Sequence, residues 1–201
     1  MIAIVDYGMG NLASVYKAIL YIGQNAMITS SPSDLIKADA VILPGVGAIS
    51  DAMNNLTALK LDNTLKDIAA GGKPLLGICL GMQMLFETSE EGAHEMPVKG
   101  LEILQGTVTK FKENPAIKIP HMGWNKLEET KSDFLTEGSY VYFVHSYFAV
   151  PEETDIITSK SFHGTYFAAS IEKGTICAMQ FHPEKSGDTG LEILRRWIQI
   201  G

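Results

Sequence analysis

The sequence contains only two cysteines, and neither lies in a spacing that binds metal. Cys79 and Cys177 are far apart, with no CxxC motif and no Cys/His pattern around either. A structural zinc site would have no ligands to build on, so we expect no metal and no other cofactor. The two side chains are therefore left, as free thiols, for packing or for chemistry.

The sequence also lacks an excess of basic residues and any long apolar run. Sixteen Lys and Arg residues against 23 Asp and Glu residues give a formal net charge of −7, which opposes binding to nucleic acid. The apolar runs are too short to cross a bilayer, which predicts no membrane span. Residues 1–6 show no basic segment, apolar core or cleavage site of a secretory signal, so we expect a cytoplasmic protein.

No linker rich in Pro, Gly or Ser and no block of like charge divides the 201 residues. That length, with 46% apolar residues, suits one well-buried core. We therefore expect a single domain over residues 1–201.

The pattern of apolar residues differs between the two halves of the chain. In the first half, short β-rich runs alternate with amphipathic segments, which predicts an α/β fold with a mostly parallel sheet flanked by helices. In the second half, runs of Val, Ile, Phe, Tyr and Thr predict an added region of largely antiparallel strands. Strands are predicted over residues 2–6, 26–29, 40–43, 75–78, 103–111, 140–150, 155–161, 166–171 and 174–181, and helices over 11–22, 48–56, 62–70 and 191–200, with a short helix opening at 31–34 and another running from Cys79 to about Glu87.

The apolar run that starts at Leu75 breaks at a cysteine held between Gly77 and Gly81, and then resumes at helical spacing. This pattern is typical of a nucleophile elbow, a tight turn from strand to helix that exposes the side chain at its apex. Glycines nearby remove the Cβ atoms that would clash in such a turn. The pattern therefore predicts a reactive thiol at Cys79, whereas Cys177 has no such surroundings and is expected in the core.

A nucleophilic thiol needs a base, and the best candidate is His182, in the segment of residues 180–186. In an extended stretch, residues two apart point to the same side, so Glu184 would face the same way as His182 while Pro183 stiffens the step between them. The carboxylate would hold the imidazole in one tautomer and stabilise the imidazolium. The combination predicts a Cys-His-Glu triad of Cys79, His182 and Glu184, although each residue alone is commonly structural.

Acyl chemistry also needs hydrogen-bond donors for the developing oxyanion. The N–H of Leu80 opens the helix after Cys79, and a second donor is expected from the glycine-rich turn at residues 44–47, on the same edge of the sheet. Gln83 lies one helical turn after Cys79, where its amide is placed to bind a polar substrate.

These motifs together resemble the class I, triad-type glutamine amidotransferases over essentially the whole chain. The elbow at residues 77–83, the turn at 44–47 and the segment at 182–184 are similar to the corresponding motifs of that family. The resemblance implies a glutamine amidotransferase domain with a flavodoxin-like core. Within the family, the chain resembles the glutaminase subunits of imidazole glycerol phosphate synthase in four segments, residues 5–12, 44–47, 120–125 and 143–147.

The resemblance implies a reaction in which Cys79 attacks the side-chain carboxamide of L-glutamine and His182 protonates the departing ammonia. Water activated by His182 would then hydrolyse the glutamyl thioester to L-glutamate. Main-chain N–H groups of Leu80, Val46 and Gly47 would hold the oxyanion. By the same resemblance, the residues that bind glutamine would be Gly45, Gln83, His145, Ser146 and Tyr147.

The chain leaves no room for a synthase domain, so the ammonia is expected to be used by another polypeptide. The resemblance implies that this partner is the cyclase subunit HisF, a (β/α)8 barrel of histidine biosynthesis, and that full activity requires it. Glycines in residues 44–47 permit a peptide rotation, so the oxyanion hole is expected to be completed only on partner binding. The interface is expected to include Met9, Asn11, His121, Met122, Trp124, Asn125 and Lys185.

Two other functions stay open on the sequence. A paralogous amidotransferase subunit would feed ammonia to a different acceptor synthase, and neither the triad nor the elbow distinguishes it. A protein of related fold but another class would use its cysteine in redox sensing or stress protection. Such a protein does not require His182, Glu184 and an oxyanion turn together.

Overall fold

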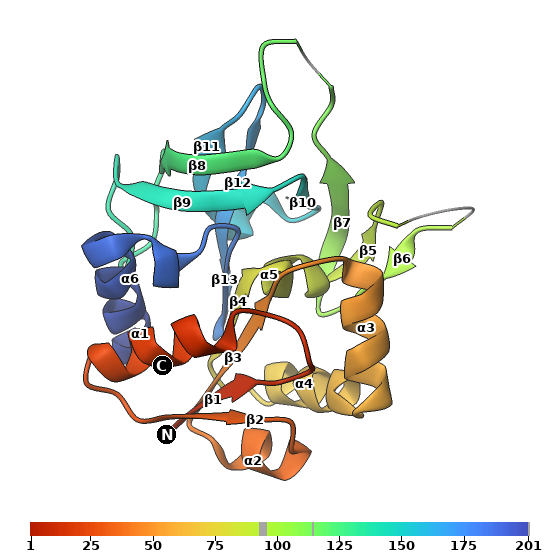
Figure 1. Ribbon diagram of the computed structural model, residues 1–201, viewed down its shortest axis with the longest axis vertical. Helices are drawn as coiled ribbons and strands as arrows, with labels where there is room; N and C mark the ends of the chain where they lie inside the picture. Colours follow the sequence, from red (N-terminus) through yellow and green to blue (C-terminus); the bar gives the residue numbers. More distant parts are fainter. Residues whose placement is uncertain (93–95, 114, 201) are drawn as a thin grey trace.

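The computed structural model describes residues 1–92, 96–113 and 115–200 of the chain (Figure 1). Its central sheet has seven strands in the order β11-β12-β13-β4-β3-β1-β2. Five neighbouring strands are parallel, and β12 and β11 extend the sheet antiparallel, which confirms the predicted α/β fold class. These strands are β1 (Ile2–Val5), β2 (Ala26–Thr29), β3 (Ala40–Gly45), β4 (Leu75–Cys79), β11 (Ile157–Phe162), β12 (Tyr166–Lys173) and β13 (Ile176–Met179).

Helices cover both faces of the sheet, with α1 and α6 on one side and α3 and α4 on the other (Figure 1). The strands feed both cores because successive side chains point to opposite faces: Val5 packs with the α3–α4 side, and Ile4 packs with the α1–α6 side. None of the helices in the described ranges has both the length and the apolarity that a bilayer crossing needs. The helices are α1 (Leu12–Tyr21), α2 (Pro32–Lys37), α3 (Ile49–Ala58), α4 (Leu61–Ala70), α5 (Leu80–Met84) and α6 (Gly187–Ile200), with 3-10 turns η1 (Thr154–Ile156) and η2 (Pro183–Lys185).

Two smaller sheets lie beside the carboxyl ends of the central parallel strands (Figure 1). One has four strands in the order β10-β7-β5-β6, and the other is an antiparallel ribbon of β8 and β9. The two smaller sheets lie next to the edge of the central sheet at which β4 ends. Their strands are β5 (Phe86–Ser89), β6 (Val98–Lys99), β7 (Leu104–Lys110), β8 (His121–Lys126), β9 (Tyr140–His145) and β10 (Tyr147–Pro151).

The helix that follows the elbow is shorter than the sequence predicts. It ends at Met84, and the chain continues as strand β5, in which the buried Phe86 pairs with Leu104. The N–H of Leu101 donates to the Met84 carbonyl at 2.7 Å, and the N–H of Leu104 donates to the Leu85 carbonyl at 2.9 Å. Tertiary pairing therefore satisfies the carbonyls that a longer helix would have used.

The predicted strand over residues 140–150 is in fact two strands that meet at Ser146, because β9 pairs with β8 while β10 pairs with β7. Sequence patterns predict no strand over residues 121–126, where β8 lies. Its alternation places His121 inside and the apolar Met122 and Trp124 outside, the reverse of an ordinary amphipathic strand. Helix α6 also begins earlier than predicted, at residue 187 rather than 191.

Candidate active site

Cys79 lies at the junction of β4 and α5, as the elbow pattern predicts. Its backbone angles, φ 54° and ψ −107°, are unusual for a residue with a side chain, a strain that costs on the order of 1–3 kcal/mol. A Cβ on Gly81 would lie 1.8 Å from the Leu43 carbonyl oxygen, and a Cβ on Gly77 would lie 2.9 Å from the Gly81 carbonyl oxygen. The two glycines therefore allow the strained turn to pack tightly against itself and against β3.

The imidazole of His182 is held by Glu184 and faces the nucleophile. Nδ1 of His182 and Oε1 of Glu184 are 2.9 Å apart, and both side chains are almost wholly buried. The other ring nitrogen, Nε2, is buried and has no hydrogen-bond partner among the described residues. Burial lowers the pKa of His182, but the interactions of the ring with Cys79 and Glu184 outweigh burial and raise the pKa above its usual range. The structure thus brings the three predicted triad residues together.

The reason for the proximity of His182 and Glu184 differs from the predicted one. The segment is not extended through both residues: His182 is extended, and Pro183 then opens the 3-10 turn η2, which contains Glu184. Ser186 fastens this turn, since its hydroxyl donates to the His182 carbonyl at 2.6 Å and accepts the Tyr142 N–H at 2.9 Å. The base is therefore anchored to strand β9 through a buried serine.

A pocket of about 190 Å³ opens over Cys79 and contains most of the predicted site. Leu80 begins α5, so its N–H has no acceptor within the helix. Three of the predicted catalytic and substrate-binding residues do not line this pocket: His182, Glu184 and Gly45. Gly45 pairs with Cys79, and a Cβ there would lie 2.5 Å from the Tyr7 hydroxyl. The lining residues are Val46, Gly47, Cys79, Leu80, Gln83, Glu91, Val144, His145, Ser146 and Tyr147.

Gln83 lines this pocket, and its amide nitrogen is held by two acceptors. It donates to the Tyr147 carbonyl at 2.8 Å and to Oε1 of Gln180 at 3.0 Å. Gln180 in turn places its own amide nitrogen 3.7 Å from Sγ of Cys79. Sequence patterns did not single out Gln180, although its position two residues before His182 would have placed both on one side of an extended segment.

Glu91 is a second residue that the motifs did not indicate. It is the only acidic residue in the pocket lining among the described residues, and its carboxylate accepts the Ile49 N–H at 3.0 Å, at the start of α3. Burial raises the pKa of Glu91 despite that hydrogen bond. No local sequence signal marks this residue, because only the fold brings the segment after β5 to the mouth of the pocket.

The prediction that His121 faces a partner protein is wrong, because the side chain is only 5% exposed. Its Nδ1 lies 3.0 Å from Nε2 of His145, whose Nδ1 lies 2.8 Å from the Tyr147 carbonyl. Asn125 also turns inward: its amide nitrogen lies 3.1 Å from Nε2 of His121 and donates to the Phe162 carbonyl at 2.8 Å. His121 therefore supports the fold beneath the ribbon of β8 and β9, whereas Asn125 stays partly exposed.

The other predicted interface residues are accessible. Met122 and Trp124 are 63% and 56% exposed on the outer face of the ribbon. The Trp124 ring extends over the segment that follows the catalytic turn, because a Cβ on Gly187 would lie 3.9 Å from its Cη2. The remaining three are the exposed Lys185 and the partly exposed Met9 and Asn11.

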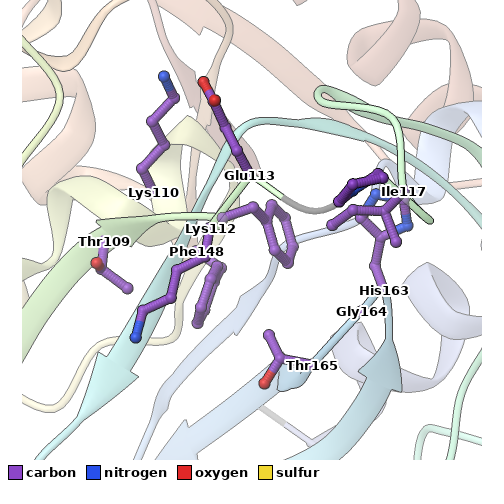
Figure 2. Close-up of a pocket in the computed structure, with 11 residues that line it drawn as sticks. Thr109, Lys110, Lys112, Glu113, Ile117, Phe148, His163, Gly164 and Thr165 are labelled. Carbon is purple, nitrogen blue, oxygen red and sulfur yellow. The ribbon is translucent and has the colours of Figure 1, made fainter.

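A larger cavity, of about 430 Å³, shares no lining residue with the pocket over Cys79 (Figure 2). Its walls include the aromatic Phe111 and Phe148 together with Lys112 and His163, and none of the triad residues lines it. The chemistry therefore belongs to the smaller pocket. Among the residues that the structure describes, no group of three or more His, Cys, Asp or Glu side chains is arranged to hold a metal ion.

Comparisons with known proteins find relatives that match this chain over its whole length. The imidazole glycerol phosphate synthase subunit HisH of Shouchella clausii is 50% identical over 207 residues, which cover 100% of this chain and 98% of that protein. The protein of the same name from Listeria monocytogenes is 48% identical over 204 residues, covering 100% of this chain and 96% of that protein.

Solved structures share the fold at lower identity. One described as a glutamine amidotransferase has a TM-score of 0.77 at 18% identity, covering 98% of this chain and 97% of that one. The structure of PurLQS from Thermotoga maritima has a TM-score of 0.73 at 18% identity, covering 99% and 97%. The family model for glutamine amidotransferase class-I matches residues 3–200. This chain belongs to the class-I glutamine amidotransferase family.

Proposed function

We propose that this chain is the glutaminase subunit of an imidazole glycerol phosphate synthase and hydrolyses L-glutamine to L-glutamate and ammonia. The observation that carries the proposal is the assembly of Cys79, His182 and Glu184, with Cys79 in the lining of a pocket. Identity of 48% over the whole chain to a subunit with that name supports this choice over other members of the family.

In the proposed reaction, Sγ of Cys79 attacks the carboxamide carbon of glutamine while His182 holds the thiol proton. The carboxamide oxygen becomes negative and accepts hydrogen bonds from the N–H groups of Leu80 and of the turn at Val46 and Gly47. These three residues line the same pocket. His182 then gives its proton to the nitrogen, the C–N bond breaks, and ammonia leaves a glutamyl thioester. Glu184 stabilises the imidazolium throughout, because it stays bound to Nδ1.

Water completes the cycle. It gives a proton to His182 and attacks the thioester carbon; the C–S bond then breaks, and glutamate leaves as the thiolate re-forms. The raised pKa of His182 supports this assignment, since it favours a proton on the imidazole next to the Cys79 sulfur.

Charge complementarity in the pocket suggests how the amino-acid end of glutamine is bound. The carboxylate of Glu91 is the counter-charge for the α-ammonium group. The carbonyls of Ser146 and Tyr147 already accept hydrogen bonds from Phe111 and from Gln83, respectively. The N–H of Ser146 makes no hydrogen bond within the described parts of the chain, and it is the natural donor for the α-carboxylate.

The proposed partner is the cyclase subunit HisF, a (β/α)8 barrel that uses the ammonia. The face that we assign to it is formed by Met9, Asn11, Met122, Trp124, Asn125 and Lys185. Exposed Trp and Met side chains are typical anchors of protein interfaces.

A steady-state glutaminase assay with and without the cyclase subunit and its nucleotide ligand tests the proposal. We expect glutamine hydrolysis to be slow for the isolated chain and to rise by at least about tenfold in the complex with its ligand, because the partner completes the oxyanion turn. Absence of glutamine hydrolysis in the assembled complex would contradict the proposal.

A further inference from the structure

A chain of side-chain hydrogen bonds connects the main chain of β10 to the nucleophile. It starts at the Tyr147 carbonyl, passes through the amides of Gln83 and Gln180, and ends at Sγ of Cys79. Gln180 is fully buried, and its own N–H donates to the Ala169 carbonyl at 2.9 Å, which fixes its backbone to strand β12. The backbone of Gln180 is therefore fixed by β12, and its side-chain amide is fixed by Gln83.

The direction of this chain is determined by its first member. A carbonyl only accepts hydrogen bonds, so Gln83 must turn its amide nitrogen, and not its oxygen, toward Tyr147. The second N–H of that nitrogen then requires an acceptor, and Gln180 supplies its oxygen. The amide nitrogen of Gln180 consequently has one orientation available, toward the Cys79 sulfur.

An N–H donor at sulfur favours the negative thiolate over the neutral thiol. The Val144 carbonyl has the opposite preference, because it lies 3.9 Å from Sγ and accepts a hydrogen bond from the neutral thiol. His182 also interacts with this sulfur, as does the Tyr7 hydroxyl, whose own hydrogen bond goes to the Pro44 carbonyl. Gln180 and His182 thus support the thiolate together against one carbonyl that supports the thiol.

We propose that Gln180 is a further catalytic residue, whose side-chain N–H stabilises the Cys79 thiolate and joins it to Gln83 on the substrate side of the pocket. This inference rests on the proposed glutaminase function. The Gln180 N–H stabilises the Cys79 sulfur in two steps, the attack of the sulfur on the amide and its departure from the thioester. Sγ carries negative charge in both steps.

Two variants of Gln180 separate this role from a purely structural one. Gln180→Glu has almost the same shape and keeps an acceptor for Gln83, but its ionised carboxylate offers the sulfur no N–H. Gln180→Met is uncharged and similar in length, so it keeps the test valid if the buried carboxylate disturbs folding. Gln105→Glu, an exposed position on β7, is the matched control for the charge change.

The first readout is the rate of alkylation of Cys79 by iodoacetamide at neutral pH. Burial and the charge of Glu172 raise the pKa of the Cys177 thiol to about 12, so that thiol stays protonated and does not contribute. We expect both Gln180 variants to lower the alkylation rate by about ten- to a hundredfold, the usual effect of losing a hydrogen bond to a charged group. The control should alkylate at the parent rate.

The second readout is kcat for glutamine in the complex with the cyclase subunit, which we expect to fall by a similar factor while ammonium-driven synthesis stays within about twofold of the parent. Alkylation of either folded variant at the parent rate would overturn the proposal, even if kcat fell. A parent complex that does not hydrolyse glutamine would refute the proposed function instead, and the alkylation comparison would still decide the role of Gln180.

Discussion

Cys79 and Cys177 are nearly equally buried, with exposed fractions of 6% and 5%, but their surroundings give them opposite chemistry. Cys177 packs in the core, where burial and the charge of Glu172 raise its pKa. Cys79 faces a histidine and an amide nitrogen instead. At the scale of single residues, reactivity is therefore set by the groups around the sulfur and not by burial.

Glu91 gives a prediction at this scale. Glu91→Gln removes the charge that pairs with the α-ammonium group of glutamine, so we expect KM to rise by about tenfold, with kcat changing less than threefold. Steady-state kinetics in the complex measure both values. Glu102→Gln, at an exposed side chain that does not line this pocket, is the control. A fall in kcat at unchanged KM would show that Glu91 does not bind the substrate.

Some of these residues could be predicted from the sequence, and others could not. Cys79 and His182 carry local signals, since glycines frame the first and a proline and a glutamate follow the second. Gln180 and Glu91 gain their roles only from contacts with residues far away in the chain. His121 was wrongly placed on the surface because nothing nearby in the sequence shows that it pairs with His145.

At the scale of elements, the elbow depends on close backbone contacts that only glycine permits. Gly81→Ala would place a Cβ 1.8 Å from the Leu43 carbonyl oxygen, so we expect a loss of about 3 kcal/mol or more in the free energy of unfolding. Gly23→Ala is the matched control: its φ is +83° with no atom within 4 Å, which predicts a loss of only about 1 kcal/mol. Denaturant unfolding gives both numbers, and equal losses would refute the packing argument.

The ribbon of β8 and β9 links the partner-facing surface to the nucleophile. Its outer face presents Met122 and Trp124, and Met122 pairs across the ribbon with Val144, whose carbonyl lies 3.9 Å from Cys79 Sγ. Strand β8 of this ribbon escaped sequence analysis because its inward-facing side chains are largely polar, with His121 and Asn125 forming hydrogen bonds. Short strands of this kind have no clear apolar alternation to detect.

Trp124→Ala tests the assigned face. We expect the dissociation constant for the cyclase subunit to rise by at least about tenfold, because exposed tryptophans are frequent anchors of interfaces. The free energy of unfolding of the isolated chain should change by less than about 1 kcal/mol, since the side chain is 56% exposed. Tyr21→Ala, at a side chain 76% exposed near the end of α1, is the control. Unchanged binding by the Trp124 variant would show that the interface lies on another face of the chain.

At the scale of the whole molecule, the site results from the order of strands. β4 lies between β3 and β13, so the glycine-rich turn, Cys79 and the segment that leads to His182 emerge at one edge of the sheet. The alternation of strands and helices made this parallel core predictable. The smaller sheets that close the pocket were less predictable, because their pairing joins residues far apart in the sequence.

The buried histidines predict how the stability of the molecule depends on pH. Burial, with the charge of His163, lowers the pKa of His121 to about 4, and burial outweighs the hydrogen bond to Tyr147 in lowering the pKa of His145 to about 3. Both rings are neutral in the folded chain but take up a proton near pH 6.5 when unfolded. The contribution of these two neutral histidines to the free energy of unfolding is therefore complete above pH 6.5 and is lost as the pH falls toward 4.

We expect the free energy of unfolding to fall by on the order of 2 to 3 kcal/mol from these two histidines between pH 7 and pH 5. Chemical denaturation across that range, compared with the double variant His121→Gln/His145→Gln, isolates the effect from other titrating groups. The variant should have the shallower dependence. Parallel curves for the two proteins would show that the histidines do not titrate as their burial requires.

The central claim is that Cys79 supplies ammonia from glutamine and that a second protein uses it. The most direct measurement compares glutamine-driven with ammonium-driven synthesis by the Cys79→Ala complex with the cyclase subunit. We expect glutamine-driven synthesis to fall by at least about a thousandfold, because the nucleophile is lost, while ammonium-driven synthesis stays within about twofold of the parent. Loss of both activities together, or retention of the glutamine-driven one, would contradict the claim.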